Sequence, residues 1–179
     1  MFQFTSLPLP QAQLISLPSF NDARGNFTKT FHQGTFQEQR INFELKESYF
    51  SISKKDVIRG MHFQIPPYKH AKIVFCPKGA ILDVIVDIRK QSPSYGKYYA
   101  AELSETNHQA YYIPEGFAHG FMALTEGAIT YYLVSSMYSQ PHDTGIRYDS
   151  IGYDWGIKNP LLSERDLSFI SFKEFESPF

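Results

Sequence analysis

The dominant pattern in this chain is a series of short apolar-rich segments separated by turn-forming residues. These segments alternate apolar and polar side chains, or are rich in Val, Ile, Tyr and Phe, and both features favour strands. The pattern predicts strands at residues 49–53, 57–64, 71–76, 80–89, 98–103, 109–113, 120–124 and 128–134. Many short strands at this spacing are typical of a sandwich or barrel, so we expect an all-β fold.

Residues 80–89 have the clearest alternation. One face of this predicted strand carries only apolar side chains, at Leu82, Val84, Val86 and Ile88. The other face alternates apolar residues with Asp83 and Asp87, and a buried acid needs a partner. We expect Asp87, next to the following turn, to face solvent. For Asp83, the pattern leaves open whether the side chain lines a pocket or meets solvent.

The flanking regions are less regular. The sequence from Asn21 to Gly25 indicates a turn between two strands, and residues 34–43 are the one helix candidate before the C-terminus. Ser163, with Asp166 three residues later, predicts the start of a short helix. We expect one domain over residues 1–179, with an N-terminal strand arm (1–48), a barrel core (49–138) and a C-terminal segment with short helices (139–179).

Composition excludes several classes of protein. The 179 residues are enough to bury a core, and a net charge of −1 gives no general attraction to nucleic acid or to an anionic membrane. Cys76 is the single cysteine, which excludes an internal disulfide and fits a reducing cytoplasm; we expect it to be buried. The N-terminus does not read as a signal peptide, and no apolar run reaches the ~20 residues of a membrane helix. We therefore expect a cytoplasmic protein with no nucleic-acid or membrane partner.

The candidate chemistry gathers around His62. Arg59 and Lys72 lie close to it in sequence and supply two fixed cations, while Gln64 shares its strand parity. A base between two cations suits proton removal from carbon in an anionic substrate. Strict alternation would send Arg59 and His62 to opposite faces, so we expect a bulge at Gly60 that brings them to one side.

Aromatic and histidine residues later in the chain extend this set. One of Tyr131 and Tyr132 must point inward, and an inward phenol could donate a proton. Lys72, if it faces the pocket, could stabilise an oxyanion. His119 lies in a Gly-rich corner, where a structural role and a catalytic role are both open.

A metal site is the main alternative. Pro114, Gly116 and His119 resemble the second sequence motif of the cupin superfamily, whose metal-binding members also carry a His-x-His in the first motif. Here that place reads His62-Phe63-Gln64, so the second histidine is absent. We therefore expect a cupin-type jelly-roll barrel without a metal.

Several separated segments together resemble one family, the dTDP-4-dehydrorhamnose 3,5-epimerases. The resemblance runs from about residue 20 to residue 166. It rests on residues 20–27, 57–64 with 66–68, 83–89 with 92–97, 113–121 and 162–166. It implies inversion of the carbons flanking the C4 ketone of a nucleotide-linked 4-keto-6-deoxy sugar, through an enolate and without a cofactor. The implied reaction converts dTDP-4-dehydro-6-deoxyglucose into dTDP-4-dehydrorhamnose, for rhamnose in cell-surface polysaccharide.

The resemblance also implies a role for each matching residue. His62 would be the base, oriented by Asp166, with Lys72 holding the enolate oxygen and Tyr132 acting as the acid across the ring. The residues implied in substrate binding are Phe20, Arg24, Phe27, Glu47, Arg59, Gln64, His119 and Tyr138. The family forms homodimers that exchange N-terminal strands, so residues 20–27 would serve the partner subunit's site.

The chain departs from the family pattern at the nucleotide end. Lys29 stands where an acid is usual, and Glu47 and Tyr49 stand where Gln and Asn are usual. Two alternatives remain open: an epimerase that inverts one centre of another nucleotide sugar, such as a CDP-4-keto-deoxyhexose, or a sugar-nucleotide 3,4-ketoisomerase. A non-catalytic sugar-nucleotide binding module is disfavoured because His62, Tyr132 and Asp166 are all present.

Overall fold

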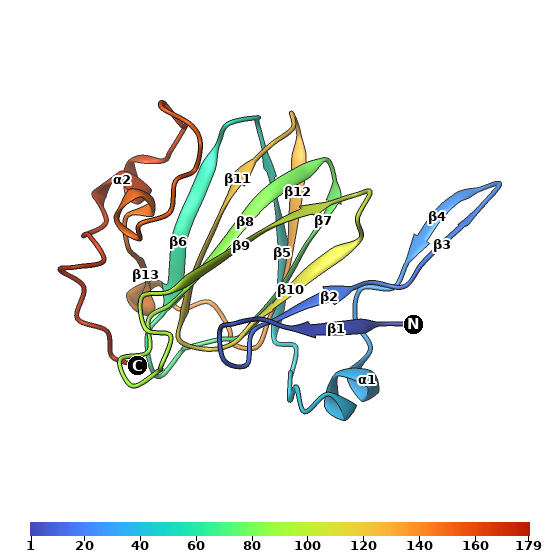
Figure 1. The fold of residues 1–179 in the computed structure, drawn as a ribbon, viewed down its shortest axis with the longest axis horizontal. Helices are drawn as coiled ribbons and strands as arrows, with labels where there is room; N and C mark the ends of the chain where they lie inside the picture. The colour runs from blue at the N-terminus through green and yellow to red at the C-terminus, as the bar shows by residue number, and fades with distance from the viewer.

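Two antiparallel sheets face each other in the computed structural model, which describes residues 1–179 (Figure 1). The six-stranded sheet has the spatial order β1 (Gln3–Ser6), β2 (Gln13–Ser16), β10 (Gln109–Ile113), β7 (Lys72–Lys78), β12 (Ala128–Val134), β5 (Glu47–Ser53). The five-stranded sheet has the order β13 (Asp143–Gly145), β6 (Ile58–Gln64), β11 (Phe117–Ala123), β8 (Ala80–Asp87), β9 (Tyr98–Ser104). Every strand predicted between residues 49 and 138 is confirmed, although several of their ends shift.

The remaining elements lie outside the two sheets. The strands β3 (Ser19–Asp22) and β4 (Gly25–Thr28) pair only with each other, and this hairpin projects away from the sheets (Figure 1). The helices are α1 (Gln33–Glu38) and α2 (Glu164–Ser168), with short 3₁₀ turns at η1 (Gln140–His142) and η2 (Tyr148–Ser150). No helix is both long enough and apolar enough to cross a membrane.

The local sequence explains where both helices stop and start. The His32 side chain caps α1 by accepting the backbone N–H of Thr35. Arg40, just beyond the helix, has a left-handed backbone with φ of 61°, so α1 is shorter than the predicted 34–43 segment. Ser163 caps α2 as predicted, and its hydroxyl accepts the backbone N–H of Asp166.

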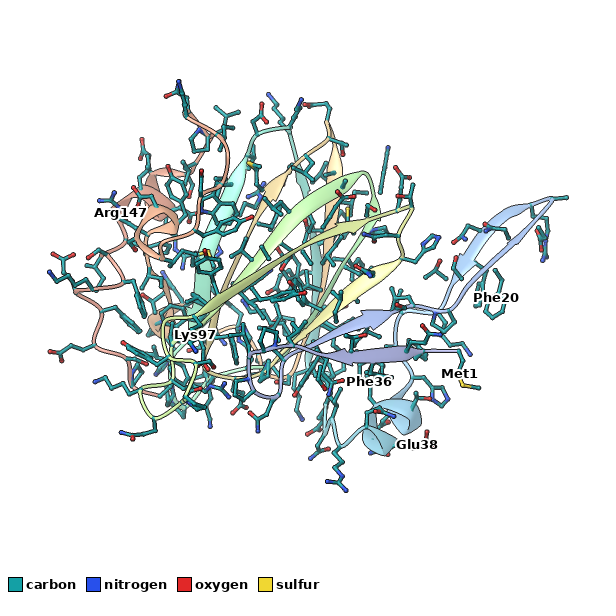
Figure 2. The ribbon with its side chains drawn as sticks, viewed as in Figure 1. Met1, Phe20, Phe36, Glu38, Lys97 and Arg147 are labelled. Carbon is teal, nitrogen blue, oxygen red and sulfur yellow. The ribbon has the colours of Figure 1, made fainter.

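Three buried clusters fix the positions of the sheets. One fills the space between them, and includes Ile81, Ile85 and Tyr111. A second lies on the outer face of the five-stranded sheet, where side chains of the C-terminal segment pack against those of β6 and β8. Figure 1 shows this segment beside β6. A third packs α1, through Phe36, against the outside of the six-stranded sheet; Figure 2 labels this residue beneath β1. Strand β8 is therefore buried on both faces, which explains its apolar sequence.

The expectation that Asp87 faces solvent is wrong. Its side chain is fully buried, because the turn after β8 folds back and surrounds the carboxylate with donors. Arg89 donates from Nε and Nη2 at 2.9 and 2.7 Å, and the hydroxyls of Ser92 and Ser94 donate at 2.5 and 2.6 Å. Burial alone would raise the pKa of Asp87, but these donors hold this pKa below its usual value. Cys76 is buried, as predicted.

Candidate active site

A pocket of about 370 Å³ opens between the two sheets. Both sheets, the loop that follows β12 and the helix α2 contribute side chains to it. Its lining consists of Glu47, Tyr49, Ser51, Arg59, His62, Gln64, His70, Lys72, His119, Tyr132, Val134, Ser136, Tyr138, Asp143 and Arg165. The sequence-predicted cluster of Arg59, His62 and Lys72 is therefore brought together in one cavity.

The predicted bulge at Gly60 is confirmed. His62 pairs with His119 on β11, and Arg59 pairs with Phe121, so three steps on β6 match two on β11. The extra residue turns Arg59 and His62 to the same side, and both line the pocket. Gly60 is required there, because it has a φ of 144° and a Cβ would come within 2.5 Å of the Gly120 Cα.

His62 and Asp166 form a hydrogen-bonded pair. His62 Nε2 lies 2.8 Å from Asp166 Oδ1, and the Gly60 N–H donates to Asp166 Oδ2 at 3.1 Å. Burial alone would raise the pKa of Asp166, but the hydrogen bonds from His62 and Gly60 hold this pKa below its usual value. An ionised Asp166 keeps the proton on His62 Nε2, which leaves Nδ1 with a free lone pair. His62 is thus prepared to act as a base.

Lys72 is a buried cation in the wall of the pocket. Its side chain is almost fully buried, and Nζ donates to the His62 carbonyl oxygen at 3.1 Å. Burial lowers the pKa of Lys72 to about 8, partly offset by the nearby carboxylates of Asp143 and Asp83. A desolvated ammonium of this kind can stabilise an oxyanion strongly, because the local dielectric is low.

Tyr132 is the inward member of the tyrosine pair, while Tyr131 packs against Phe75 outside the pocket. Burial raises the pKa of Tyr132 well above its usual value of 10, so the phenol stays protonated and can donate. The His119 ring lies edge-on to Tyr132, with ring centres 6.0 Å apart.

His119 itself is held by Asp83. His119 Nε2 lies 2.9 Å from Asp83 Oδ2, and both side chains are buried. Burial lowers the pKa of His119 even though Asp83 opposes this shift. Asp83 therefore faces the interior, where the sequence pattern had left its position open.

Glu47 and Gln64 hold the loop that follows β12. Glu47 Oε2 accepts the backbone N–H of Tyr138 at 2.8 Å, and Gln64 Oε1 accepts that of Ser139 at 2.6 Å. Gln64 Nε2 donates to the Met137 carbonyl at 3.1 Å. These contacts place the exposed Tyr138 ring at the mouth of the pocket. Both Glu47 and Gln64 line the pocket, although Gln64 is buried and its amide is already hydrogen-bonded.

The sequence analysis missed six of the lining residues, and two of these, Arg165 and Asp143, are charged. Arg165 Nη2 lies 2.6 Å from Asp143 Oδ2, and its guanidinium lies 5.3 Å from the centre of the Phe169 ring. Arg165 could have been predicted to lie near the site, because it directly precedes Asp166 in the helix that Ser163 caps. Asp143 follows an irregular proline-containing segment and carried no such signal.

Phe20, Arg24 and Phe27 do not reach the pocket of their own chain. They lie on the projecting β3–β4 hairpin, on which Figure 2 labels Phe20. Phe20 is 59% and Phe27 63% exposed, and their ring centres are 6.3 Å apart. Arg24 pairs with Asp22 on the same hairpin. Lys29, directly after β4, is exposed as well.

Comparison with known proteins identifies the family. The family model for dTDP-4-dehydrorhamnose 3,5-epimerase matches residues 6–174. The chain belongs to this family. It is 38% identical over 180 residues to the dTDP-4-dehydrorhamnose 3,5-epimerase of Sinorhizobium fredii, covering 98% of this chain and 92% of the relative.

Solved structures of family members have the same fold. The dTDP-4-dehydrorhamnose 3,5-epimerase of Sulfolobus tokodaii is 42% identical, with a TM-score of 0.93 and 98% of each chain covered. The epimerase of Legionella pneumophila, solved in complex with dTDP-4-keto-L-rhamnose, is 28% identical, with a TM-score of 0.94 and 98% and 95% covered. The predicted all-β, cupin-type jelly roll of the family is thereby confirmed.

Proposed function

We propose that this chain converts dTDP-4-dehydro-6-deoxyglucose into dTDP-4-dehydrorhamnose by inverting C3 and C5. One observation carries the proposal: a base and an acid face the same pocket from opposite sheets. His62 comes from β6 in the five-stranded sheet, and Tyr132 comes from β12 in the six-stranded sheet. Inversion needs a proton to leave one face of the sugar ring and to return on the other.

The chemistry follows from the C4 ketone of the substrate. His62 Nδ1 takes the proton from the adjacent carbon, the C–H electron pair forms a double bond to C4, and the carbonyl π pair moves onto the oxygen to give an enolate. Lys72 holds the enolate oxygen. Tyr132 then gives its proton to the opposite face of the same carbon, and solvent exchange restores both groups for the second centre. The cycle neither oxidises nor reduces the sugar, so we propose no cofactor.

The diphosphate of the substrate requires cations at the pocket. Arg59 is exposed, with Nε bonded to Ser53 Oγ and Nη2 to the Ile52 carbonyl. Its remaining amino group, Nη1, can contact phosphate. Arg165 is held by Asp143 and lies on the same pocket. Guanidinium groups suit phosphate oxygens because they offer several donors in one plane.

We further propose that the chain forms a homodimer in which the β3–β4 hairpin enters the partner subunit's site. An exposed pair of phenylalanines on a projecting hairpin favours burial against another molecule. Strand β5 is an edge strand with exposed Phe50 and Ile52, and such an edge is usually covered. Phe20, Phe27 and Arg24 would then contact the nucleotide in the neighbouring pocket. The proposed compartment is the cytoplasm, which suits the free thiol of Cys76.

Mixing two inactive variants tests the exchange of hairpins. Arg24→Ala damages the hairpin, and His62→Asn damages the base. If the hairpin serves the partner, a dimer of one Arg24→Ala subunit and one His62→Asn subunit has one site that carries both substitutions. Its other site carries neither. Activity should therefore reappear after subunits are mixed, towards about a quarter of the wild-type level at random pairing. Absence of recovery in dimers shown to be mixed by mass spectrometry would contradict the exchange.

The reaction itself is tested by following dTDP-4-dehydro-6-deoxyglucose with proton NMR. The H2–H3 coupling constant reports the configuration at C3, and the nuclear Overhauser effect between H3 and H5 reports whether C5 has the matching configuration. We expect dTDP-4-dehydrorhamnose with the wild type and none with His62→Asn. A migrating carbonyl would instead indicate a ketoisomerase, and an unchanged substrate would refute the proposal.

A further inference from the structure

Tyr49 stacks on Tyr132 inside the pocket. The two residues are directly opposite each other on the paired strands β5 and β12. Their ring centres are 4.9 Å apart and their planes differ by 26°, which is a stacked arrangement. Tyr49 is 42% exposed and lines the same pocket as Tyr132. One face of the Tyr132 ring is therefore covered by a second phenol from the edge of the sheet.

A second contact of the Tyr132 ring is already fixed. His119 lies edge-on to this ring, and His119 is locked by its buried pair with Asp83. Tyr49 is the remaining aromatic contact that limits the swing of Tyr132. The reach of a phenol hydroxyl depends strongly on the ring direction, because the oxygen lies at the far end of the side chain. A donor displaced by about 1 Å loses much of its effect.

We propose that Tyr49 is a positioning residue for the acid Tyr132. The proposal rests on the proposed function: the Tyr49 ring holds the Tyr132 phenol against the face of the sugar opposite His62. The enolate is then protonated by Tyr132 before His62 can return its own proton. Tyr49 thus determines how often proton removal leads to inversion, and it leaves the rate of proton removal unchanged.

The experiment compares the ratio of solvent-deuterium exchange to net inversion in four proteins. Tyr49→Leu removes the ring, whereas Tyr49→Phe keeps the ring and removes only the hydroxyl. Tyr98→Leu is the matched control, because Tyr98 is also 42% exposed on an edge strand and pairs with another ring, that of Tyr153. We expect Tyr49→Leu to raise the ratio of exchange to inversion roughly two- to tenfold. Loss of one aromatic pair changes the population of the supported Tyr132 conformation by about this factor. Tyr49→Phe and Tyr98→Leu should keep the wild-type ratio.

Two results of this kinetic comparison would overturn the proposal. An unchanged ratio in Tyr49→Leu would show that Tyr132 needs no such support. Equal effects of Tyr49→Phe and Tyr49→Leu would assign the role to the hydroxyl and not to the ring. A general loss of stability would lower exchange and inversion together, so it would not imitate the expected result.

A measurement without substrate separates this inference from the proposed reaction. In protein labelled with ¹³C at tyrosine rings, the Tyr132 signal is assigned by its loss in Tyr132→Phe. We expect one ordered ring environment in the wild type and in Tyr49→Phe, and motional averaging in Tyr49→Leu. An unaltered signal in Tyr49→Leu would refute the positioning role. A wild type that turns over no substrate would refute the proposed reaction and leave this ring measurement decisive for Tyr49.

Discussion

Replacing Asp166 by Asn should disable His62 without removing it. Asp166 accepts two hydrogen bonds, one from His62 at Oδ1 and one from the Gly60 backbone at Oδ2. An Asn side chain has one oxygen, and the Gly60 N–H can only donate. The oxygen should therefore turn to Gly60, which places the amide NH₂ against His62 Nε2. His62 must then accept at Nε2 and carry its proton on Nδ1, the nitrogen that has to act as the base.

The size of the effect follows from the loss of the base. A positioned general base contributes about 10²–10⁴ in rate, and a histidine held in the wrong tautomer costs about 10⁴ in the serine-protease triad. We therefore expect Asp166→Asn to lower kcat by about 10³–10⁴, or roughly 4–5.5 kcal/mol of barrier. The KM should change little, because Asp166 is buried behind His62 and does not line the pocket.

The assay is steady-state epimerisation with circular dichroism as a check on folding. Ser163→Ala is the control, because it removes the cap of α2 and leaves the Asp166 carboxylate in place. This control should lose about 1 kcal/mol of stability and keep most of its kcat. Near-normal turnover by Asp166→Asn would refute the tautomer argument. A comparable loss in Ser163→Ala would assign the effect to the position of the helix.

The remaining predictions concern the acid, the buried cation, metals and the nucleotide. Tyr132→Phe should reduce inversion more than deuterium exchange, and equal losses would indicate a packing role or participation in both steps. Burial lowers the pKa of Lys72 from 10.5 to about 8, so activity should fall above pH 8, where the folded protein loses this charge. For the same reason Lys72→Met should stabilise the fold most below pH 8 and least above pH 10.5. A difference in Tm between Lys72→Met and the wild type that does not change with pH would contradict this. Activity should persist in EDTA, since the Gln64 amide already holds the loop after β12; loss of activity restored by one divalent ion would contradict this. Lys29 and Glu47 should alter the contacts to the nucleotide, which is tested by measuring the binding of dTDP, CDP, UDP and GDP in competition by calorimetry. If dTDP binds at least tenfold more tightly than the others, and neither Lys29→Glu nor Glu47→Gln tightens its binding, the two residues are neutral for nucleotide choice.

The sequence was most informative where chemistry and local geometry coincide. The bulge at Gly60 could be predicted because only a break in alternation puts Arg59 and His62 on one face. The cap at Ser163 could also be predicted, since a side-chain oxygen and a nearby backbone N–H are local partners. Alternation alone could not decide between Tyr131 and Tyr132, because each face of that strand carries one tyrosine beside apolar residues; only the family resemblance indicated Tyr132.

Long-range contacts account for the rest. Asp87 is buried by donors from a turn whose path the strand pattern does not specify. Asp143 reaches the pocket only because β13 pairs with β6, a contact between distant parts of the chain. The stack of Tyr49 on Tyr132 depends on the register of β5 against β12, which a one-residue shift would abolish.

Site-resolved deuterium incorporation is the most direct test of the central claim. The wild-type protein is incubated with dTDP-4-dehydro-6-deoxyglucose in D₂O, and the label at each sugar carbon is read by NMR. A base and an acid on opposite faces of one pocket should place deuterium at both C3 and C5, with inverted configuration at each. Label at neither carbon, or retention of configuration at both, would contradict the account.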